Sequence, residues 1–270
     1  MEAGIYRELA LELERADAEA RPIPQISARY PDMTIEDAYG IQSAWMELKY
    51  EQGRTKVGRK IGLTSRAMQR ASGISEPDFG VILDDMIYWS GQTIPTSKFI
   101  VPRIEVEIAF ILERPLRGPG CTLLDVLDAT KYILPALELI DARVEIEDRD
   151  TGKRRNVRDT ISDNAANGAV ILGGAPCRVS DADLPRIAAS LRRNAVIEDS
   201  GVAAAVLDHP ATGVAWLANK LAPFDAELSP GEIILSGSFT APVAARPGDV
   251  FYADYGQLGV VAIDFSRDDQ

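Results

Sequence analysis

The stretch from residue 103 to residue 112 constrains the fold more than any other part of the chain. Its side chains alternate between two faces, as they do along a β-strand. One face is a continuous apolar stripe made of Ile104, Val106, Ile108, Phe110 and Leu112. The opposite face carries Glu105 and Glu107 side by side and becomes apolar two residues later. The pattern predicts a core strand with two carboxylates near one end.

Helical spacing characterises the residues before Pro77. Ile5, Leu9 and Leu13 recur at helical intervals, and Thr34 is a suitable N-cap for a second helix. After Pro77 the pattern changes to short apolar stretches separated by glycine and proline. We therefore expect helices first and a mainly β-structured region after them.

The strands expected in the second region do not alternate regularly with helices. Strand patterns occur at 86–89, 103–112, 133–141, 168–173, 195–198, 232–236 and, as two strands, within 249–265. Helix patterns occur at about 122–131, 181–191 and 210–221. This order favours a mixed α+β sheet or roll over a doubly wound fold. We expect a helical N-terminal lobe over 1–80 and a mixed β-roll catalytic core over 81–270, as one continuous domain.

Composition limits the possible partners of the chain. Its 270 residues carry a net charge of -12, which disfavours nucleic acid and anionic membranes. No apolar run approaches the ~20 residues needed to span a bilayer, and no secretory signal is visible. Cys121 and Cys177 are isolated, so we expect free thiols and a cytoplasmic location.

A third acid, Glu138, lies in an otherwise apolar strand pattern. A buried carboxylate is costly unless it is protonated, paired or bound to a metal. With Glu105 and Glu107 it would form a hard oxygen site suited to Mg²⁺ or Mn²⁺. Spacing alone leaves another interpretation open, in which the strand acids face solvent beside Arg103 and Glu138 pairs with Arg143 or a lysine.

Five short segments occur together in a characteristic order: 60–65, 77–80, 102–110, 135–141 and 163–167. In this order they resemble the hydratase/decarboxylase branch of the fumarylacetoacetate hydrolase superfamily. The resemblance implies a mixed β-roll core of the fumarylacetoacetate hydrolase C-terminal type, a helical N-terminal lobe and a homo-oligomer. It also implies a Mg²⁺ or Mn²⁺ site whose ligands are Glu105, Glu107 and Glu138.

The same resemblance implies a metal-dependent hydratase that adds water to a 2-oxo-4-enoate or a 2-hydroxy-dienoate. The expected substrate is a small dicarboxylic 2-oxo acid, 2-oxohept-4-ene-1,7-dioate, which would give 4-hydroxy-2-oxoheptanedioate in homoprotocatechuate degradation. Two alternative enzymes are a 2-hydroxypenta-2,4-dienoate hydratase and a 4-oxalocrotonate-type decarboxylase. A third alternative is a non-catalytic scaffold partner of a related enzyme.

Lys60 and Asp78 are the candidates for catalysis. By sequence alone Lys60 could be a surface lysine, but the resemblance places it in the pocket, where desolvation beside a metal could lower its pKa. Asp78 could be a turn aspartate that caps its own backbone. The resemblance instead implies a base that activates water or relays a proton.

Three residues are candidates for binding substrate: Ser162, Ser238 and Leu83. Ser162 could donate a hydrogen bond to the substrate carboxylate, or it could be a helix N-cap. Ser238 follows an expected strand and Gly237 at a plausible pocket edge.

A dioate has a second carboxylate, which needs a cation or backbone donors. Four arginines are candidates for holding it: Arg66, Arg70, Arg143 and Arg158.

His209 is the single histidine of the chain and stands directly before Pro210, at the expected start of a helix. This position favours a structural role, and one histidine so placed does not support a catalytic triad.

Overall fold

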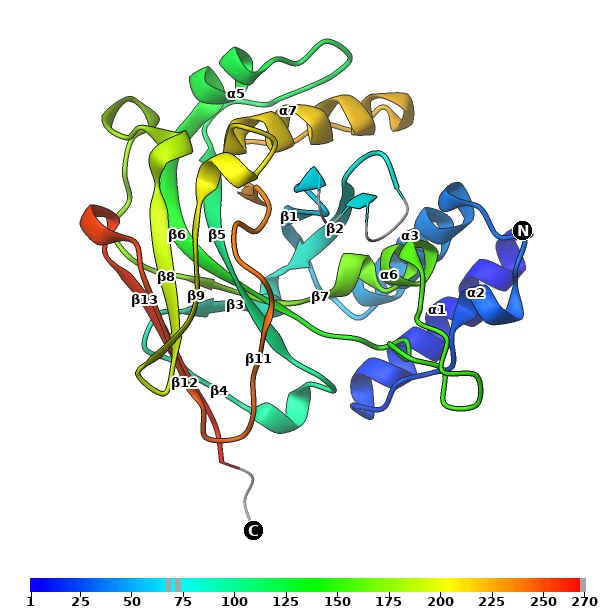
Figure 1. Cartoon of the computed structure of the whole chain (residues 1–270). Coiled ribbons are helices and arrows are strands. Elements are labelled where there is room, and N and C mark those ends of the chain that lie inside the picture. The colour runs from blue at the N-terminus through cyan, green and yellow to red at the C-terminus, as the bar shows by residue number, and fades with distance from the viewer. Residues whose placement is uncertain (67–68, 71–73, 268–270) are drawn as a thin grey trace.

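The computed structural model describes residues 1–66, 69–70 and 74–267, and its N-terminal part is a helical lobe (Figure 1). The lobe contains α1 (Ala3–Ala18), α2 (Ile26–Arg29) and α3 (Ile35–Glu51). The Asp37 N–H donates to the Thr34 hydroxyl at 3.1 Å, and the Thr34 N–H donates to the Asp37 carboxylate at 2.7 Å. This reciprocal cap confirms the predicted start of α3.

The lobe packs directly onto the sheet. Leu9, Leu13 and Trp45 are almost completely buried in one cluster. The same cluster includes Val81 and Leu83 of β2 (Asp78–Leu83), and α6 (Val157–Ser162) contacts α3. The predicted boundary at residue 80 therefore falls inside a strand that belongs to the sheet and contributes to the core of the lobe.

The larger sheet has the strand order β2-β1-β10-β5-β6-β7-β3, and β11 pairs with the first residues of β5. Its further strands are β1 (Lys56–Gly62), β3 (Ile87–Trp89), β5 (Arg103–Leu112), β6 (Thr130–Ile140), β7 (Asn167–Leu172), β10 (Ile233–Leu235) and β11 (Val243–Ala244). The sheet is mixed, because β1 pairs with β10 and β3 with β7 in parallel, whereas β5 and β6 are antiparallel. Contacts between β2 and β7 show that it curls back on itself, which confirms the predicted mixed β-roll.

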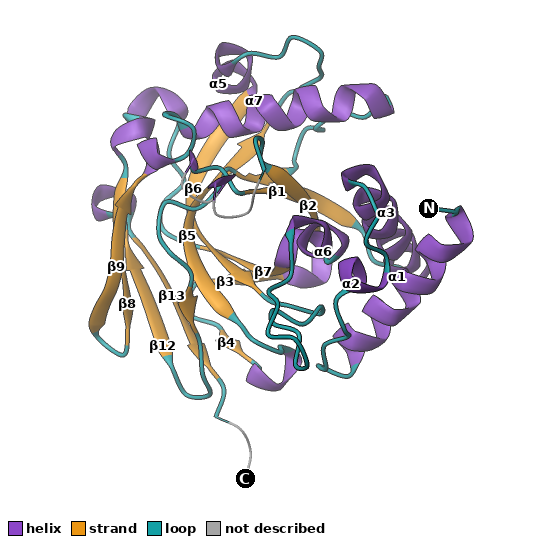
Figure 2. Ribbon diagram, turned by 45° about the vertical axis from the view of Figure 1, so that its right-hand side comes forward, coloured by secondary structure: helices purple, strands orange, loops and turns teal. Residues whose placement is uncertain are grey.

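A smaller sheet, ordered β4-β13-β12-β8-β9, lies beside the larger one (Figure 2). Its strands are β4 (Thr93–Ile94), β8 (Ala188–Arg193), β9 (Val196–Val202), β12 (Val250–Asp254) and β13 (Val260–Phe265). The apolar stripe of β5 packs in one core with Phe251 and Ile263 of the smaller sheet. The helices α5 (Leu123–Ala129) and α7 (Pro210–Leu221) lie together at one end of both sheets.

The helix expected over 181–191 is wrong. A short 3-10 turn at Leu184–Arg186 is followed by β8, which pairs with β9 and β12. Ala189 and Leu191 are buried at an interval of two residues, which is the period of a strand. The helix-favouring alanines in this segment suggested a helix, but cross-strand packing overrides such weak propensities. Strand β1, which carries Lys60, has no counterpart among the expected strands.

One face of the larger sheet changes from apolar to acidic along its strands. Its apolar part is a cluster formed by Ile82, Ala109, Ala136, Val170, Leu172 and Leu235. The next residues on the same face of β5 and β6 are Glu107, Glu105 and Glu138. The acids therefore adjoin an apolar interior, where charged groups are poorly solvated.

Cys121 and Cys177 are both free thiols, as predicted. Among the described residues, no helix has the length and apolar character needed to cross a membrane.

Candidate active site

The three predicted metal ligands come together on β5 and β6. In the register of these strands Glu105 lies directly opposite Glu138, and Glu107 lies opposite Ala136. Each acid offers one carboxylate oxygen, and these oxygens all lie within 4.8 Å of one another. Like charges directly opposite one another destabilise a strand pair. This arrangement therefore needs a compensating positive charge.

Burial of the acids increases the need for a compensating positive charge. Glu107 and Glu138 are 1% and 0% exposed, so the interpretation of a solvated acidic face is wrong. Burial, then the charge of Glu138, raises the pKa of Glu105 to about 8, although Lys60 acts in the opposite direction. The same causes raise the pKa of Glu107 well above its ordinary value. Neither carboxylate oxygen of Glu138 accepts a well-formed hydrogen bond from a described residue. Oxygen ligands with negative charge and free lone pairs fit a hard divalent cation.

Two residues just beyond strand ends, Gly237 and Tyr255, contact the strands that carry Glu105, Glu107 and Glu138, the acid cluster. The Gly237 N–H donates to Glu107 Oε2 at 2.9 Å. Gly237 has a φ of +115°, and a Cβ there would lie 2.2 Å from Thr64 Oγ1, so this position requires glycine. The Tyr255 hydroxyl lies 3.0 Å from the Glu107 carbonyl and 2.5 Å from the Ala136 carbonyl, and thus bridges β5 and β6. No sequence pattern indicated Tyr255, whereas Gly237 is recognisable as a glycine directly after an expected strand.

Lys60 reaches the acid cluster from β1. Its Nζ lies 3.1 Å from Glu138 Oε1 and 2.9 Å from the Ala165 carbonyl, and the residue is 3% exposed. The pairing of Glu138 with Arg143 is therefore wrong, and so is the interpretation of Lys60 as a surface residue. Burial lowers the pKa of Lys60, but the charges of Glu138, Asp78 and the two other acids outweigh it and raise the pKa. Beside the acids alone Lys60 is therefore an ammonium ion, whereas the lowered pKa expected beside a bound metal stays a prediction.

Asp78 is the first residue of β2 and lies opposite Gly62 of β1. It is 2% exposed and lies in a strand rather than in a turn. A Cβ at Gly62 would lie 2.2 Å from Asp78 Oδ1 and 3.1 Å from Lys60 Nζ, which places both groups around the same glycine. Neither oxygen accepts a well-formed hydrogen bond from a described residue. Burial raises the pKa of Asp78 to about 6, with Lys60 acting against this shift and Glu138 adding to it.

The three predicted substrate-binding residues make contacts within the fold. The Ser162 hydroxyl donates to the Arg158 carbonyl at the end of α6, whose N-cap is Asn156, so its interpretation as an N-cap is wrong. The Ser238 hydroxyl donates to the Thr240 carbonyl at 2.9 Å. Gly237, the residue before it, donates its N–H to Glu107 of the acid cluster. Leu83 lies in the core of the lobe, at the opposite end of β2 from Asp78. Substrate contact by these three residues stays a prediction.

The arginines proposed for a distal carboxylate fall into two groups. Arg143 is buried against Asp163, with Nε 2.6 Å from Oδ1. Arg158 donates to the carbonyls of residues 31 and 33 in the lobe. Both guanidinium groups form hydrogen bonds within the protein, so the prediction that Arg143 or Arg158 holds the distal carboxylate is wrong. Arg66 and Arg70 are exposed and remain candidates.

His209 caps α7, as the sequence predicts. Its Nδ1 accepts a hydrogen bond from the Ala211 N–H at 3.1 Å. Burial lowers the pKa of His209, which is consistent with a neutral imidazole that acts as an acceptor.

Comparison with known proteins agrees with this geometry. No protein-family model matches the chain. The chain is 58% identical over 257 residues to 2-oxo-hept-4-ene-1,7-dioate hydratase from Escherichia coli, covering 95% of this chain and 96% of that protein. It is also similar to the structure of 4-oxalocrotonate decarboxylase from Pseudomonas putida G7 complexed with magnesium and adipate. That likeness has a TM-score of 0.93 at 34% identity and covers 98% of both chains.

A more distant structure shows the same fold. Fumarylpyruvate hydrolase from Pseudomonas aeruginosa, in complex with Mn²⁺ and pyruvate, has a TM-score of 0.58 at 16% identity. The likeness covers 78% of this chain and 89% of that one. The near-complete coverage of the closer relatives, together with the acid cluster, identifies the family. The chain belongs to the hydratase/decarboxylase branch of the fumarylacetoacetate hydrolase superfamily.

Proposed function

We propose that the protein is a divalent-metal-dependent hydratase that converts 2-oxohept-4-ene-1,7-dioate to 4-hydroxy-2-oxoheptanedioate. The observation that carries the proposal is the convergence of Glu105, Glu107 and Glu138 with Lys60 and Asp78 at one end of an apolar interior. The 58% identity to the Escherichia coli hydratase supports hydration and this substrate.

Glu105, Glu107 and Glu138 would hold Mg²⁺ or Mn²⁺. When bound there, such a cation supplies Lewis acidity toward the oxygens of a 2-oxo acid. The magnesium in the related decarboxylase structure supports this assignment. The ammonium of Lys60 adds a fixed positive charge beside the acids, where negative charge develops on the 2-oxo oxygen of the substrate.

Hydration requires proton transfers at carbon and at water. A proton leaves C3 and another arrives at C5, which brings the double bond into conjugation with the 2-oxo group. Water then adds at C4, and a proton arrives at C3. Lys60 has three N–H donors, of which two face the Ala165 carbonyl and Glu138. We assign the remaining donor to delivering the protons that arrive at C5 and C3. The proton that leaves C3 goes to Asp78, which lies around the same glycine as Lys60 and returns it to the lysine.

Asp78 is assigned as the base for water. Its pKa of about 6 makes it mainly ionised at neutral pH, yet basic enough to accept a proton when water adds. Its oxygens are not tied up by well-formed hydrogen bonds to described residues, so they can bind water.

Product analysis tests the proposal. Purified protein with Mg²⁺ or Mn²⁺ is incubated separately with 2-oxohept-4-ene-1,7-dioate, 2-hydroxypenta-2,4-dienoate and 4-oxalocrotonate, and the products are identified by mass. We expect a gain of water, fastest with the seven-carbon dioate. Loss of CO₂ alone would instead identify a decarboxylase, the alternative that the likeness to 4-oxalocrotonate decarboxylase favours.

A variant of one ligand separates an enzyme from a scaffold. Glu107→Gln keeps an acceptor for the Gly237 N–H but removes one ligand charge. We expect Mn²⁺ affinity to fall on the order of 10²-fold or more and turnover to be lost, while circular dichroism is unchanged. A wild-type protein that neither turns over a dienoate nor binds Mn²⁺ would support the scaffold instead.

Two further properties belong to the same proposal. We expect a homo-oligomer, which light scattering coupled to size exclusion would detect, and a cytoplasmic location, which fractionation of the source cells would test.

A further inference from the structure

Three consecutive residues between α6 and β7 have a left-handed backbone. Asn164, Ala165 and Ala166 have φ values of +51°, +50° and +62°. Asparagine tolerates this region, but alanine is disfavoured there because its Cβ approaches the following carbonyl. Such strain persists only where surrounding contacts fix the backbone, and it is concentrated at functional sites. We call these three residues the left-handed turn.

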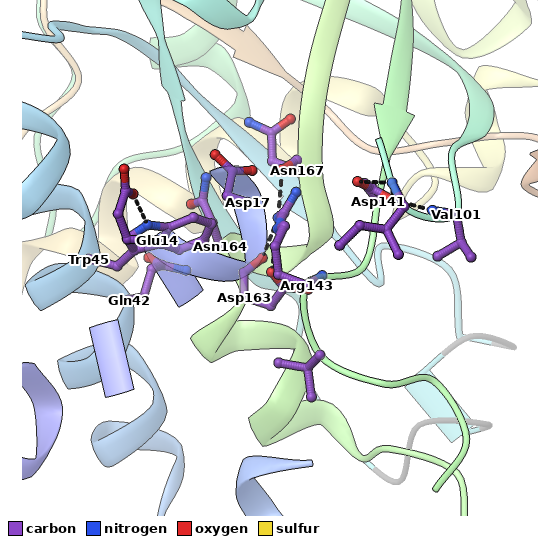
Figure 3. A network of polar contacts seen from close by, with 12 residues as sticks. Glu14, Asp17, Gln42, Trp45, Val101, Asp141, Arg143, Asp163, Asn164 and Asn167 are labelled. Carbon is purple, nitrogen blue, oxygen red and sulfur yellow. Dashed lines mark hydrogen bonds and ion pairs between the residues drawn. The ribbon is translucent and has the colours of Figure 1, made fainter. Parts of the chain in front are cut away.

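A buried ion pair fixes the start of the turn (Figure 3). Asp163 accepts hydrogen bonds from the Arg143 backbone N–H at 2.9 Å and from Arg143 Nε at 2.6 Å. The Arg143 guanidinium also donates to the carbonyls of Asp163 at 3.0 Å and Asn167 at 2.8 Å, so it binds the chain on both sides of the turn. Asp163 is 0% and Arg143 2% exposed. These bonds hold both ends of the turn in one place.

The Asn164 side chain fixes the turn against β2. Its Oδ1 accepts from the Val81 N–H at 2.7 Å, and its Nδ2 donates to the Val81 carbonyl at 2.9 Å. The backbone approaches equally closely, since a Cβ at Gly80 would lie 2.5 Å from the Asn164 carbonyl oxygen. Gly80 is paired in register with Lys60 of β1. Because residue 80 is glycine, the turn can lie directly against β2, beside Lys60 of β1.

The next carbonyl of the turn, that of Ala165, accepts a hydrogen bond from Lys60 Nζ at 2.9 Å. A lysine ammonium ends a flexible four-carbon chain and has no preferred direction of its own. Glu138 alone, at 3.1 Å, would draw it toward the acid cluster. The Ala165 carbonyl is a second, neutral acceptor, and together with Glu138 it fixes where the remaining N–H points.

We propose that the left-handed turn is a device that positions Lys60, and that Asn164 is the positioning residue through which it is held. The inference rests on the proposed function, in which Lys60 delivers protons to the substrate. It assigns a role to a strained and fully buried segment that would otherwise have none. Asn164 itself acts only through the lysine.

The first test compares two buried asparagines. Asn164→Ala removes both bonds to Val81, whereas the matched control Asn167→Ala removes one bond to the same carbonyl, also 2.9 Å long, from a residue beyond the turn. We expect both variants to lose stability toward urea. Only Asn164→Ala should lose kcat, by about 10- to 100-fold, with KM and the Kd for Mn²⁺ nearly unchanged. Equal losses of kcat in the two variants would overturn the inference.

A double-mutant cycle shows whether Asn164 acts through Lys60. If it does, Asn164→Ala causes no further loss of turnover in a Lys60→Met background. If the losses of the two single variants multiply in the double variant, Asn164 supports the site in another way. That result would overturn this inference but not the proposed function. Full activity of Lys60→Met would overturn the proposed role of the lysine and this inference together.

A second variant covers the case in which Asn164→Ala does not fold. Asn164→Gly also removes both bonds to Val81, but glycine adopts a positive φ without strain. We expect the same loss of kcat, with a native circular dichroism spectrum. A folded Asn164→Gly variant with wild-type kcat would refute the positioning role.

Discussion

Removal of divalent cations should make the stability of this protein fall as the pH rises. In the folded protein, burial and then the charge of Glu138 raise the pKa of Glu105 from its ordinary value of 4.5 to about 8. Between these two values the folded state binds a proton that the unfolded state has released. The corresponding stability is therefore fully present below about pH 4.5 and is lost as the pH passes through about 8.

The size of the effect follows from the shift of the pKa. Each pKa unit corresponds to about 1.4 kcal/mol, so the full shift would amount to roughly 5 kcal/mol. Glu105 keeps part of its surface in contact with solvent, which screens the neighbouring charges. We therefore expect the free energy of unfolding to fall by about 2–4 kcal/mol between about pH 5 and about pH 8.5. This is a large part of the stability of a typical domain.

Urea unfolding in excess chelator, followed by circular dichroism, measures this change. Glu105→Gln should flatten the dependence on pH, whereas Glu51→Gln, at an exposed pair with Arg7, should leave it unchanged. Mn²⁺ at about 1,000 times its Kd should restore about 4 kcal/mol at the higher pH. Constant or rising stability with pH in chelator, or an equal pH dependence in Glu105→Gln, would refute the reasoning.

Three further predictions concern single side chains. Asp78→Asn should lower kcat on the order of 10²–10³-fold, and it should abolish the rise of the wild-type rate as the pH passes through about 6, measured as steady-state pH profiles. Arg143→Met should cost roughly 3–5 kcal/mol in urea unfolding, because it leaves the Asp163 carboxylate buried with one partner fewer; a loss below about 1 kcal/mol would contradict the structure. His209→Ala should cost about 1 kcal/mol through loss of the α7 cap and leave kcat unchanged, so a loss of turnover would argue against a purely structural histidine.

The elements that the sequence predicts correctly are those whose apolar residues recur with one strong period. Alternation over 103–112 predicted β5, and the spacing of apolar residues over 210–221 predicted α7. The strand β8 was missed because Ala188 and Ala189 fit a helix as well as a strand, and only pairing with β9 and β12 decides between them. β1 was missed because glycine and basic residues weaken its pattern.

The candidate site was predictable for its acids but not for what surrounds them. Glu105 and Glu107 share a strand face, so their proximity follows from local geometry. The opposition of Glu105 and Glu138 depends on the register of β5 with β6, which spacing along the chain does not give. The bond from Lys60 to the Ala165 carbonyl joins residues far apart in sequence through a backbone group, and no side-chain pattern signals such a contact.

The order of the strands separates two tasks. The acids lie on β5 and β6, in the middle of the larger sheet, whereas Asp78 lies on the edge strand β2 and Lys60 on β1, the strand next to that edge. β5 and β6 each form hydrogen bonds with a strand on both sides, so a change in either would disturb the whole sheet. The edge strand β2 pairs with β1 alone, so we expect the residue at position 78 to be replaceable there with the acids on β5 and β6 left in place. A single scaffold can in this way support hydration in one enzyme and loss of a carboxyl group in another.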